Sequence, residues 1–175
     1  MSVKRFDKLK SKMEFVSHIM VIAGLIFAIY QYTQMRYQER VKETLSYEKR
    51  LNDGEFLKAK TEIKEAWMNQ KSFIEELQKR GFKSKKDKEK IIEKLSDFII
   101  EKNRLQEKID LLTDFYDSLY TCVKEDICDK KTAVSFFSPY AKRFYELHLS
   151  YIKRRKEYIK EYAKGLEKLT KERER

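Results

Sequence analysis

The first marked feature of the chain is a long apolar segment without charge. No Asp, Glu, Lys or Arg lies between Glu14 and Arg36, and residues 15–32 read FVSHIMVIAGLIFAIYQY. About 20 helical residues, at about 1.5 Å each, cross the roughly 30 Å hydrocarbon layer of a bilayer. We therefore predict a single-pass transmembrane helix over residues 15–35, after a basic tail at 1–14. The side chains expected to meet lipid are Phe15, Ile19, Ile22, Leu25, Phe27, Ile29 and Tyr30.

Two other interpretations of this segment stay open. A signal peptide needs small residues at a cleavage site after its apolar run, whereas residues 30–40 read YQYTQMRYQER. A buried helix of a soluble protein would need apolar partners around its whole circumference, but the remaining helices are amphipathic. The pattern favours the membrane span over both alternatives.

Beyond the span, apolar positions recur every three or four residues, which predicts helices. The first helix should continue over 36–50 and end at the turn Asn52-Asp53-Gly54, where Asp53 can cap the next helix. That helix is expected over 55–80, with Trp67 on its buried side.

The second half predicts longer helices with few breaks. Ser84 can cap a helix over 86–123, which the polar pair at 102–103 can interrupt. Residues 124–131 read as a polar connection and 132–137 as a short helical piece. Ser138 and Pro139 read as the N-cap and first residue of a last helix over 139–168, and 171–175 should fray.

These elements predict an all-α fold, in which an N-terminal transmembrane helix continues into an elongated helical bundle over 36–170. The chain has 4 glycines and 1 proline, so few positions break helices, and its 22 Phe and Tyr residues, 11 of each, can supply a core. No single amphipathic helix hides its apolar face alone, so the stripes need one another.

Charge adds a preference for anionic neighbours. The chain has 40 Lys and Arg against 29 Asp and Glu, a formal net charge of +11. Such a balance suits phospholipid headgroups or nucleic acid, although it also describes a merely Lys-rich solvated surface. The residues expected at the headgroups are Lys4, Arg5, Lys8, Lys10, Lys12, Arg36, Arg40 and Lys42.

For the side of the membrane on which the bundle lies, the sequence features point in opposite directions. The basic tail favours a cytoplasmic N-terminus by the positive-inside rule, but both flanks of the span are basic. Cys122 and Cys128 are too few for a disulfide scaffold, so we expect two reduced thiols in a helical core. Reduced thiols and a Lys-rich domain favour a cytoplasmic bundle.

Candidate chemistry is sparse. His18 and His148 are the only histidines, and neither has a second ligand type at metal-binding spacing. Cys122 and Cys128 could form a redox pair if the domain is extracytoplasmic. No phosphate-binding loop, nucleophile elbow or zinc-protease motif occurs. We therefore expect no enzyme activity, no cofactor and no metal site.

Three stretches resemble a bacterial family of uncharacterised, single-span, membrane-anchored helical proteins. They are AIYQYTQMRYQERVKETLSYEKRLNDGEF at 28–56, KIDLLTDFYDSLYTCVKEDICD at 108–129 and FFSPYAKRFYELHLSYIKRRKE at 136–157. The chain departs from that pattern in its basic N-terminal tail and its Lys-rich stretch at 83–90. The resemblance implies a membrane-tethered helical domain and implies no reaction.

The favoured function is a membrane-anchored interaction or scaffold module, a subunit of a larger or self-associated membrane complex. Its partners would be the lipid bilayer and another protein or a second copy. Alternatives are a small membrane effector of a toxin or phage-defence system, and a membrane-tethered nucleic-acid binder, which charge alone supports. Because aromatic residues anchor interfaces, we expect Tyr151, Tyr158 and Tyr162 to contact the partner.

Overall fold

The computed structural model describes the backbone of residues 3–80 and 84–172, with the side chains of 3–14, 77–78, 80, 85–86 and 88–89 left out of the description. The described residues form helices and no strand, so the predicted all-α class is confirmed. The chain divides into two compact units, Met1–Glu39 and Arg40–Arg175, and the second is a helical bundle.

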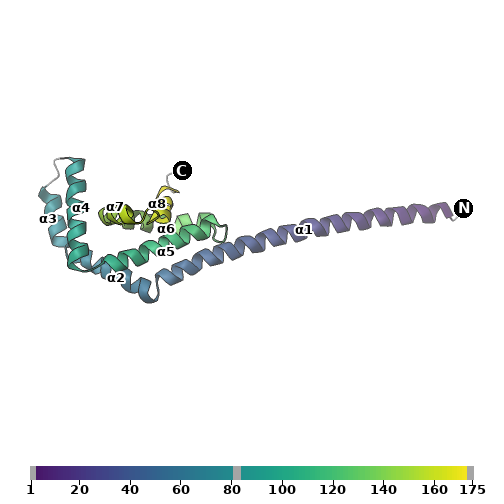
Figure 1. The fold of residues 1–175 in the computed structure, drawn as a ribbon. Coiled ribbons are helices and arrows are strands. Elements are labelled where there is room, and N and C mark those ends of the chain that lie inside the picture. Colours follow the sequence, from purple (N-terminus) through teal and green to yellow (C-terminus); the bar gives the residue numbers. More distant parts are fainter. Residues whose placement is uncertain (1–2, 81–83, 173–175) are drawn as a thin grey trace. The chain divides into compact units, whose positions relative to one another are not determined.

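Eight helices make up the described part of the chain (Figure 1). In chain order they are α1 (Val3–Leu51), α2 (Gly54–Met68), α3 (Lys71–Arg80), α4 (Lys85–Lys102), α5 (Gln106–Lys124), α6 (Lys130–Leu147), α7 (Leu149–Tyr158) and α8 (Lys164–Lys171). The expected helix over 55–80 is thus two helices, and the break expected at 102–103 separates α4 from α5.

The first unit contains the apolar part of α1. The stretch Phe15–Leu51 contains an 18-residue window with a mean hydropathy of 1.7, and none of that window is buried. Its large apolar side chains are exposed; Met20 is 69% and Leu25 is 63% exposed. By length and composition, α1 is therefore able to cross a membrane, a test that a signal sequence near an N-terminus or a core helix also passes.

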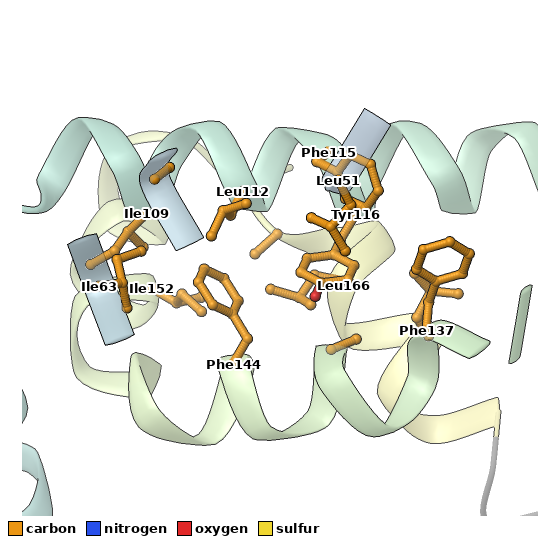
Figure 2. Packing of buried hydrophobic residues seen from close by; sticks show 14 of the residues in the cluster. Leu51, Ile63, Ile109, Leu112, Phe115, Tyr116, Phe137, Phe144, Ile152 and Leu166 are labelled. Carbon is orange, nitrogen blue, oxygen red and sulfur yellow. The ribbon is translucent and has the colours of Figure 1, made fainter. Parts of the chain in front are cut away.

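The bundle is organised around α5. This helix packs against α2, α6 and α8, and its stripe Ile109, Leu112, Phe115, Tyr116 and Leu119 is buried. Figure 2 shows this stripe facing side chains from α6 and α7, among them Phe144 and Ile152. The predicted spacing of three and four therefore does place the apolar side of α5 in the core.

Local capping sets several helix starts as the sequence predicts. The carboxylate of Asp53 accepts a hydrogen bond from the Gly54 backbone N–H at 2.7 Å, where α2 begins. The Ser84 hydroxyl accepts one from the Asp87 backbone N–H at 3.2 Å, where α4 begins. Such caps satisfy N–H groups that have no partner within the helix.

The expected start of the last helix at Pro139 is wrong. Pro139 lies inside α6, which runs unbroken from Lys130. A proline within a helix removes one backbone hydrogen bond and costs about 3 kcal/mol. Its neighbours Phe137, Ser138 and Ala141 are all at most 2% exposed. The packing of the buried side of α6 against the core, before and after Pro139, thus outweighs the local preference of proline for a first turn.

The predicted helix over 139–168 is interrupted twice. The first interruption is His148, between α6 and α7, and the second is the segment before α8, where Ala163 has a left-handed φ of 58°. Shortly after it, Gly165 packs so closely on α5 that an added Cβ would lie 2.7 Å from the Asp117 Cα. The turn at Ala163 therefore precedes a small residue at a close contact between α8 and α5.

Three aromatic residues on α2, α3 and α4 are not fully buried. Phe73 and Phe98 are 48% and 51% exposed, on α3 and α4. Trp67 is half-buried, although its indole nitrogen is shielded from solvent. The core is thus concentrated around α5 and is thinner at the α3–α4 end.

Candidate functional site

The best-connected polar contacts of the bundle gather where α1 enters it. Thr44 is fully buried, and its hydroxyl donates to the Arg40 carbonyl oxygen at 2.8 Å. The same hydroxyl accepts a hydrogen bond from the Asp129 backbone N–H at 2.8 Å. The Arg40 guanidinium pairs with the Asp126 carboxylate. These contacts fasten the α5–α6 connection onto α1.

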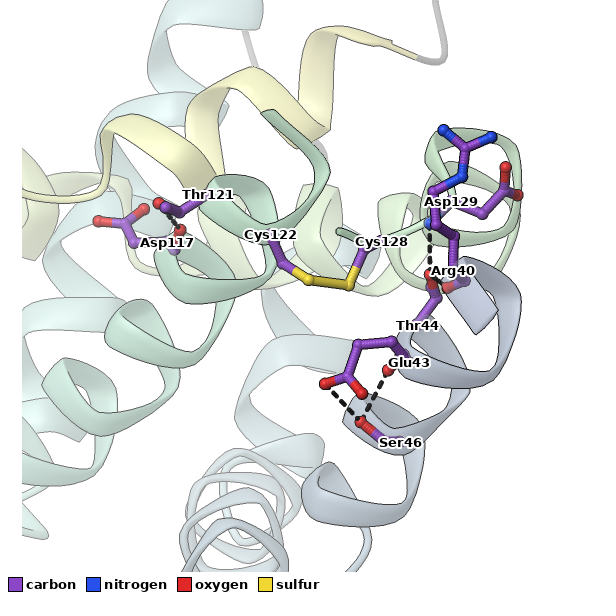
Figure 3. Close-up of a disulfide and its surroundings, with 9 residues drawn as sticks. All are labelled: Arg40, Glu43, Thr44, Ser46, Asp117, Thr121, Cys122, Cys128 and Asp129. Carbon is purple, nitrogen blue, oxygen red and sulfur yellow. Dashed lines mark hydrogen bonds between the residues drawn. A yellow bond between two sulfur atoms is a disulfide. The ribbon is translucent and has the colours of Figure 1, made fainter. Parts of the chain in front are cut away.

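A disulfide between Cys122 and Cys128 closes this connection (Figure 3). Asp126 adopts a left-handed φ of 57°, and the Cys128 backbone N–H donates to the Cys122 carbonyl oxygen at 3.0 Å. This tight turn brings the two Cα atoms to 5.2 Å. The expectation of two reduced thiols is therefore wrong, because it ignored a turn that folds the chain back within six residues.

An open cleft of about 750 Å³ lies beside the disulfide. Its lining is acidic and comprises Glu43, Tyr47, Asp114, Asp117, Ser118, Thr121, Cys122, Glu125 and Ile127. Burial raises the pKa of Asp117, a shift that the hydrogen bond from the Leu166 backbone N–H, at 2.7 Å, partly offsets. Burial, with the nearby Asp110 charge, also raises the pKa of Asp114. Within the described residues, no group of three His, Cys, Asp or Glu could hold a metal ion.

A second polar cluster centres on Asp110 of α5. One carboxylate oxygen accepts hydrogen bonds from the Tyr151 hydroxyl at 2.9 Å and the Tyr162 hydroxyl at 2.6 Å. The other accepts from the Arg155 guanidinium at 2.7 Å. Burial, together with the hydrogen bond to this carboxylate, raises the pKa of both tyrosines. The cluster joins α7 and the segment before α8 to α5.

This cluster corrects the expected partner surface. Tyr151 and Tyr162 are 6% and 7% exposed, so their rings belong to the interior of the bundle. Tyr158 is 84% exposed and stays available for a contact with a partner. The helical spacing put all three on one stripe, but Tyr158 is the last residue of α7, and Tyr162 lies in the segment between α7 and α8.

A more exposed aromatic face on α6 was not predicted from the sequence. Phe136 and Tyr140 are 47% and 67% exposed, and the exposed Pro139 and Arg143 complete the same side of the helix. The helical spacing of residues 136, 139, 140 and 143 indicates this face. It was missed because the expected helix began at Pro139, which assigned Phe136 to a separate element. We refer to these four residues as the α6 face.

The predicted headgroup residues fall into three groups. Lys4, Arg5, Lys8, Lys10 and Lys12 lie among the residues whose side chains the structure leaves out of its description. Arg36 and Lys42 are exposed, and Arg36 lies 4.0 Å from Glu39. Arg40 is turned to Asp126 within the bundle, so its charge is engaged by protein. A headgroup contact therefore stays a prediction for these residues, and Arg40 is the weakest of them.

His148 is a structural histidine of the bundle. It is 1% exposed, between the Phe144 ring, with centroids 4.6 Å apart, and the Trp67 ring at 6.3 Å. Its Nδ1 lies 2.8 Å from the Phe144 carbonyl oxygen, and its Nε2 has no partner among the described residues. Burial lowers the pKa of His148 to about 4, because a second N–H would be buried without an acceptor.

The fold and these surfaces define an all-α bundle preceded by one apolar helix of membrane-spanning length. The family described as Domain of unknown function (DUF4760) matches residues 18–173, and the chain belongs to this family. No curated protein and no solved structure matches the chain. The family agrees with the resemblance to uncharacterised proteins, whereas bacterial origin and membrane location stay predictions.

Replacing Asp110 with Ala should destabilise the bundle by about 3 kcal/mol, because two buried hydroxyls and a guanidinium lose their acceptor. The control is Glu146→Ala, an exposed carboxylate on α6, which should change stability by less than about 0.5 kcal/mol. Urea unfolding of the full chain in detergent, followed by circular dichroism, measures both. Equal effects of the two substitutions would contradict the structural role of the cluster.

The buried His148 should make stability depend on pH. The unfolded imidazole binds a proton near pH 6.5 and the folded one only near pH 4, so the unfolded state binds more protons between these values. The free energy of unfolding should therefore fall by about 1.5 kcal/mol from pH 6.5 to pH 5. Urea unfolding at both pH values should show that His148→Gln removes this part of the slope, and an unchanged slope would refute it.

Proposed function

We propose that this protein is a membrane-anchored helical interaction module with two parts, a single-span anchor and a bundle that docks a protein neighbour. The observation that carries the proposal is α1. One continuous helix has an apolar stretch that no described residue covers, and its later residues Thr44, Tyr47 and Leu51 are buried in the bundle.

The first part of this helix has the backbone hydrogen bonding and the apolar surface that a lipid bilayer requires. Its backbone hydrogen bonds are made within the helix, which is the condition for crossing hydrocarbon. Its apolar side chains lie on all sides, so a partner on one face would leave the others in water. Soluble monomers rarely expose contiguous apolar patches beyond a few hundred Å².

Association suits the bundle better than catalysis does. Its open cleft carries carboxylates without a neighbouring histidine or free thiol, so nucleophilic chemistry of the Ser–His or Cys–His type lacks its base or its nucleophile. The α6 face combines Phe136, Tyr140 and Arg143, and Tyr158 is the most exposed of the predicted contact residues. Tyr and Arg are enriched among the residues that dominate binding energy.

The membrane anchor is tested by a charge placed in its centre. Leu25→Arg should impair membrane insertion, at a cost of roughly 2.5–3.5 kcal/mol on translocon scales. The matched control is Leu57→Arg on α2, at a position that is 42% exposed. Membranes washed with alkaline carbonate should retain the unaltered chain and the control and lose part of the Leu25→Arg protein. Release of the unaltered chain would contradict the anchor.

The docking surface is tested by crosslinking in membranes. A photoreactive phenylalanine at position 140 or 158 should form adducts with a protein neighbour or a second copy, and one at exposed Lys64 of α2 should not. Tyr140→Glu should reduce association while helicity and melting stay unchanged, because the ring lies outside the core. A strictly monomeric chain without adducts would contradict docking and favour a small membrane effector.

A further inference from the structure

The turn that holds the two cysteines is part of the bundle, not an accessory loop. Cys128 is 1% exposed and Cys122 is 7% exposed. The residue after Cys128 donates its backbone N–H to the hydroxyl of Thr44 on α1, and Asp126 within the turn pairs with Arg40. The backbone therefore holds the two sulfur atoms together, where they are bonded. Disulfides persist in oxidising compartments and are rare in the cytosol.

The charges around the apolar stretch indicate the same side independently. Lys and Arg number five in residues 1–14 and four in the equally long segment 36–49 that follows the predicted span. Of those four, Arg40 is paired with Asp126, and Arg36 lies 4.0 Å from Glu39. The flank richer in Lys and Arg stays in the cytoplasm, whereas a long domain is translocated largely regardless of its own charge.

We infer that the bundle lies on the oxidising, non-cytoplasmic side of the membrane, with residues 1–14 in the cytoplasm. This inference rests on the membrane anchor of the proposed function. It replaces the expectation of a cytoplasmic bundle, which depended on reduced thiols. The docking partner is accordingly a protein with a segment on the oxidising side.

The bond between Cys122 and Cys128 then forms after translocation. The two thiols release two protons and two electrons, and a protein disulfide of the compartment takes up both and becomes a dithiol. The bond fixes the α5–α6 connection that Asp129 and Asp126 attach to α1. The α5–α6 connection, which contacts α1 through a hydrogen bond and an ion pair, is thereby closed covalently only on the side where the partner lies.

The test uses the full chain, with an epitope at each end, in the inner membrane of a bacterial host. Spheroplasts and inverted membrane vesicles are treated with a protease, and thiols are trapped in acid and labelled with a polyethylene glycol maleimide. In spheroplasts the protease should remove the C-terminal epitope and leave the N-terminal one protected. The label should shift the protein on a gel only after reduction, and the Cys122→Ser, Cys128→Ser double variant should show no shift.

Two further measurements make the result decisive. Lys10→Gln with Lys12→Gln should mix the orientations, whereas Lys58→Gln with Lys64→Gln, on exposed positions of α2, should not. A C-terminal epitope that is protected in spheroplasts and digested in inverted vesicles would overturn the inference, as would thiols that are labelled without reduction. If alkaline carbonate releases the chain, the proposed function fails as well; if the chain stays in the membrane, only its sidedness fails.

Discussion

The bundle depends on the burial of one helix, α5. It contacts α2, α6 and α8, and its apolar side is almost fully withdrawn from solvent. Phe115 of α5 stacks edge-on against Tyr47 of α1, with ring centroids 5.7 Å apart, so the end of α1 joins the same core. Elsewhere on α5, the Asp110 carboxylate accepts hydrogen bonds from two tyrosine hydroxyls and an arginine guanidinium. A single helix therefore carries both the apolar core and the polar contacts that fix the C-terminal segments.

The other constraint is that α1 must suit two surroundings. Its apolar stretch has no described residue over it, whereas Thr44 and Leu51, further along the same helix, are buried in the bundle. Removing the apolar surface of this first stretch from water is favourable, and a bilayer covers that surface on every side of the helix. The disulfide and the buried hydroxyl at Thr44 then secure the part of α1 that belongs to the bundle.

What could be predicted from the sequence was local or strongly periodic. The uncharged segment, the helical class and the cap at Asp53 depend on residues close together in the chain. Pro139 was misplaced because the preference of proline for a first turn is weaker than the packing of the buried residues that precede and follow it in α6. Tyr151 was assigned to the surface because its partner, Asp110, lies 41 residues away. The disulfide was missed because the left-handed φ of Asp126, which folds the chain back between the cysteines, was not inferred, although Asp adopts this conformation more readily than most residues.

The most direct measurement of the central claim is a spin-label scan along α1 in lipid vesicles. Single cysteines at successive positions from 15 to 50, in a background without the native pair, report accessibility to oxygen and to a water-soluble nickel complex. The account predicts that every position from 19 to 29 is open to oxygen and closed to nickel, without a helical period, and that a period of 3.6 residues begins near Arg40, where one side of the helix becomes buried. Nickel access at Leu25, or a helical period through the apolar stretch, would contradict it.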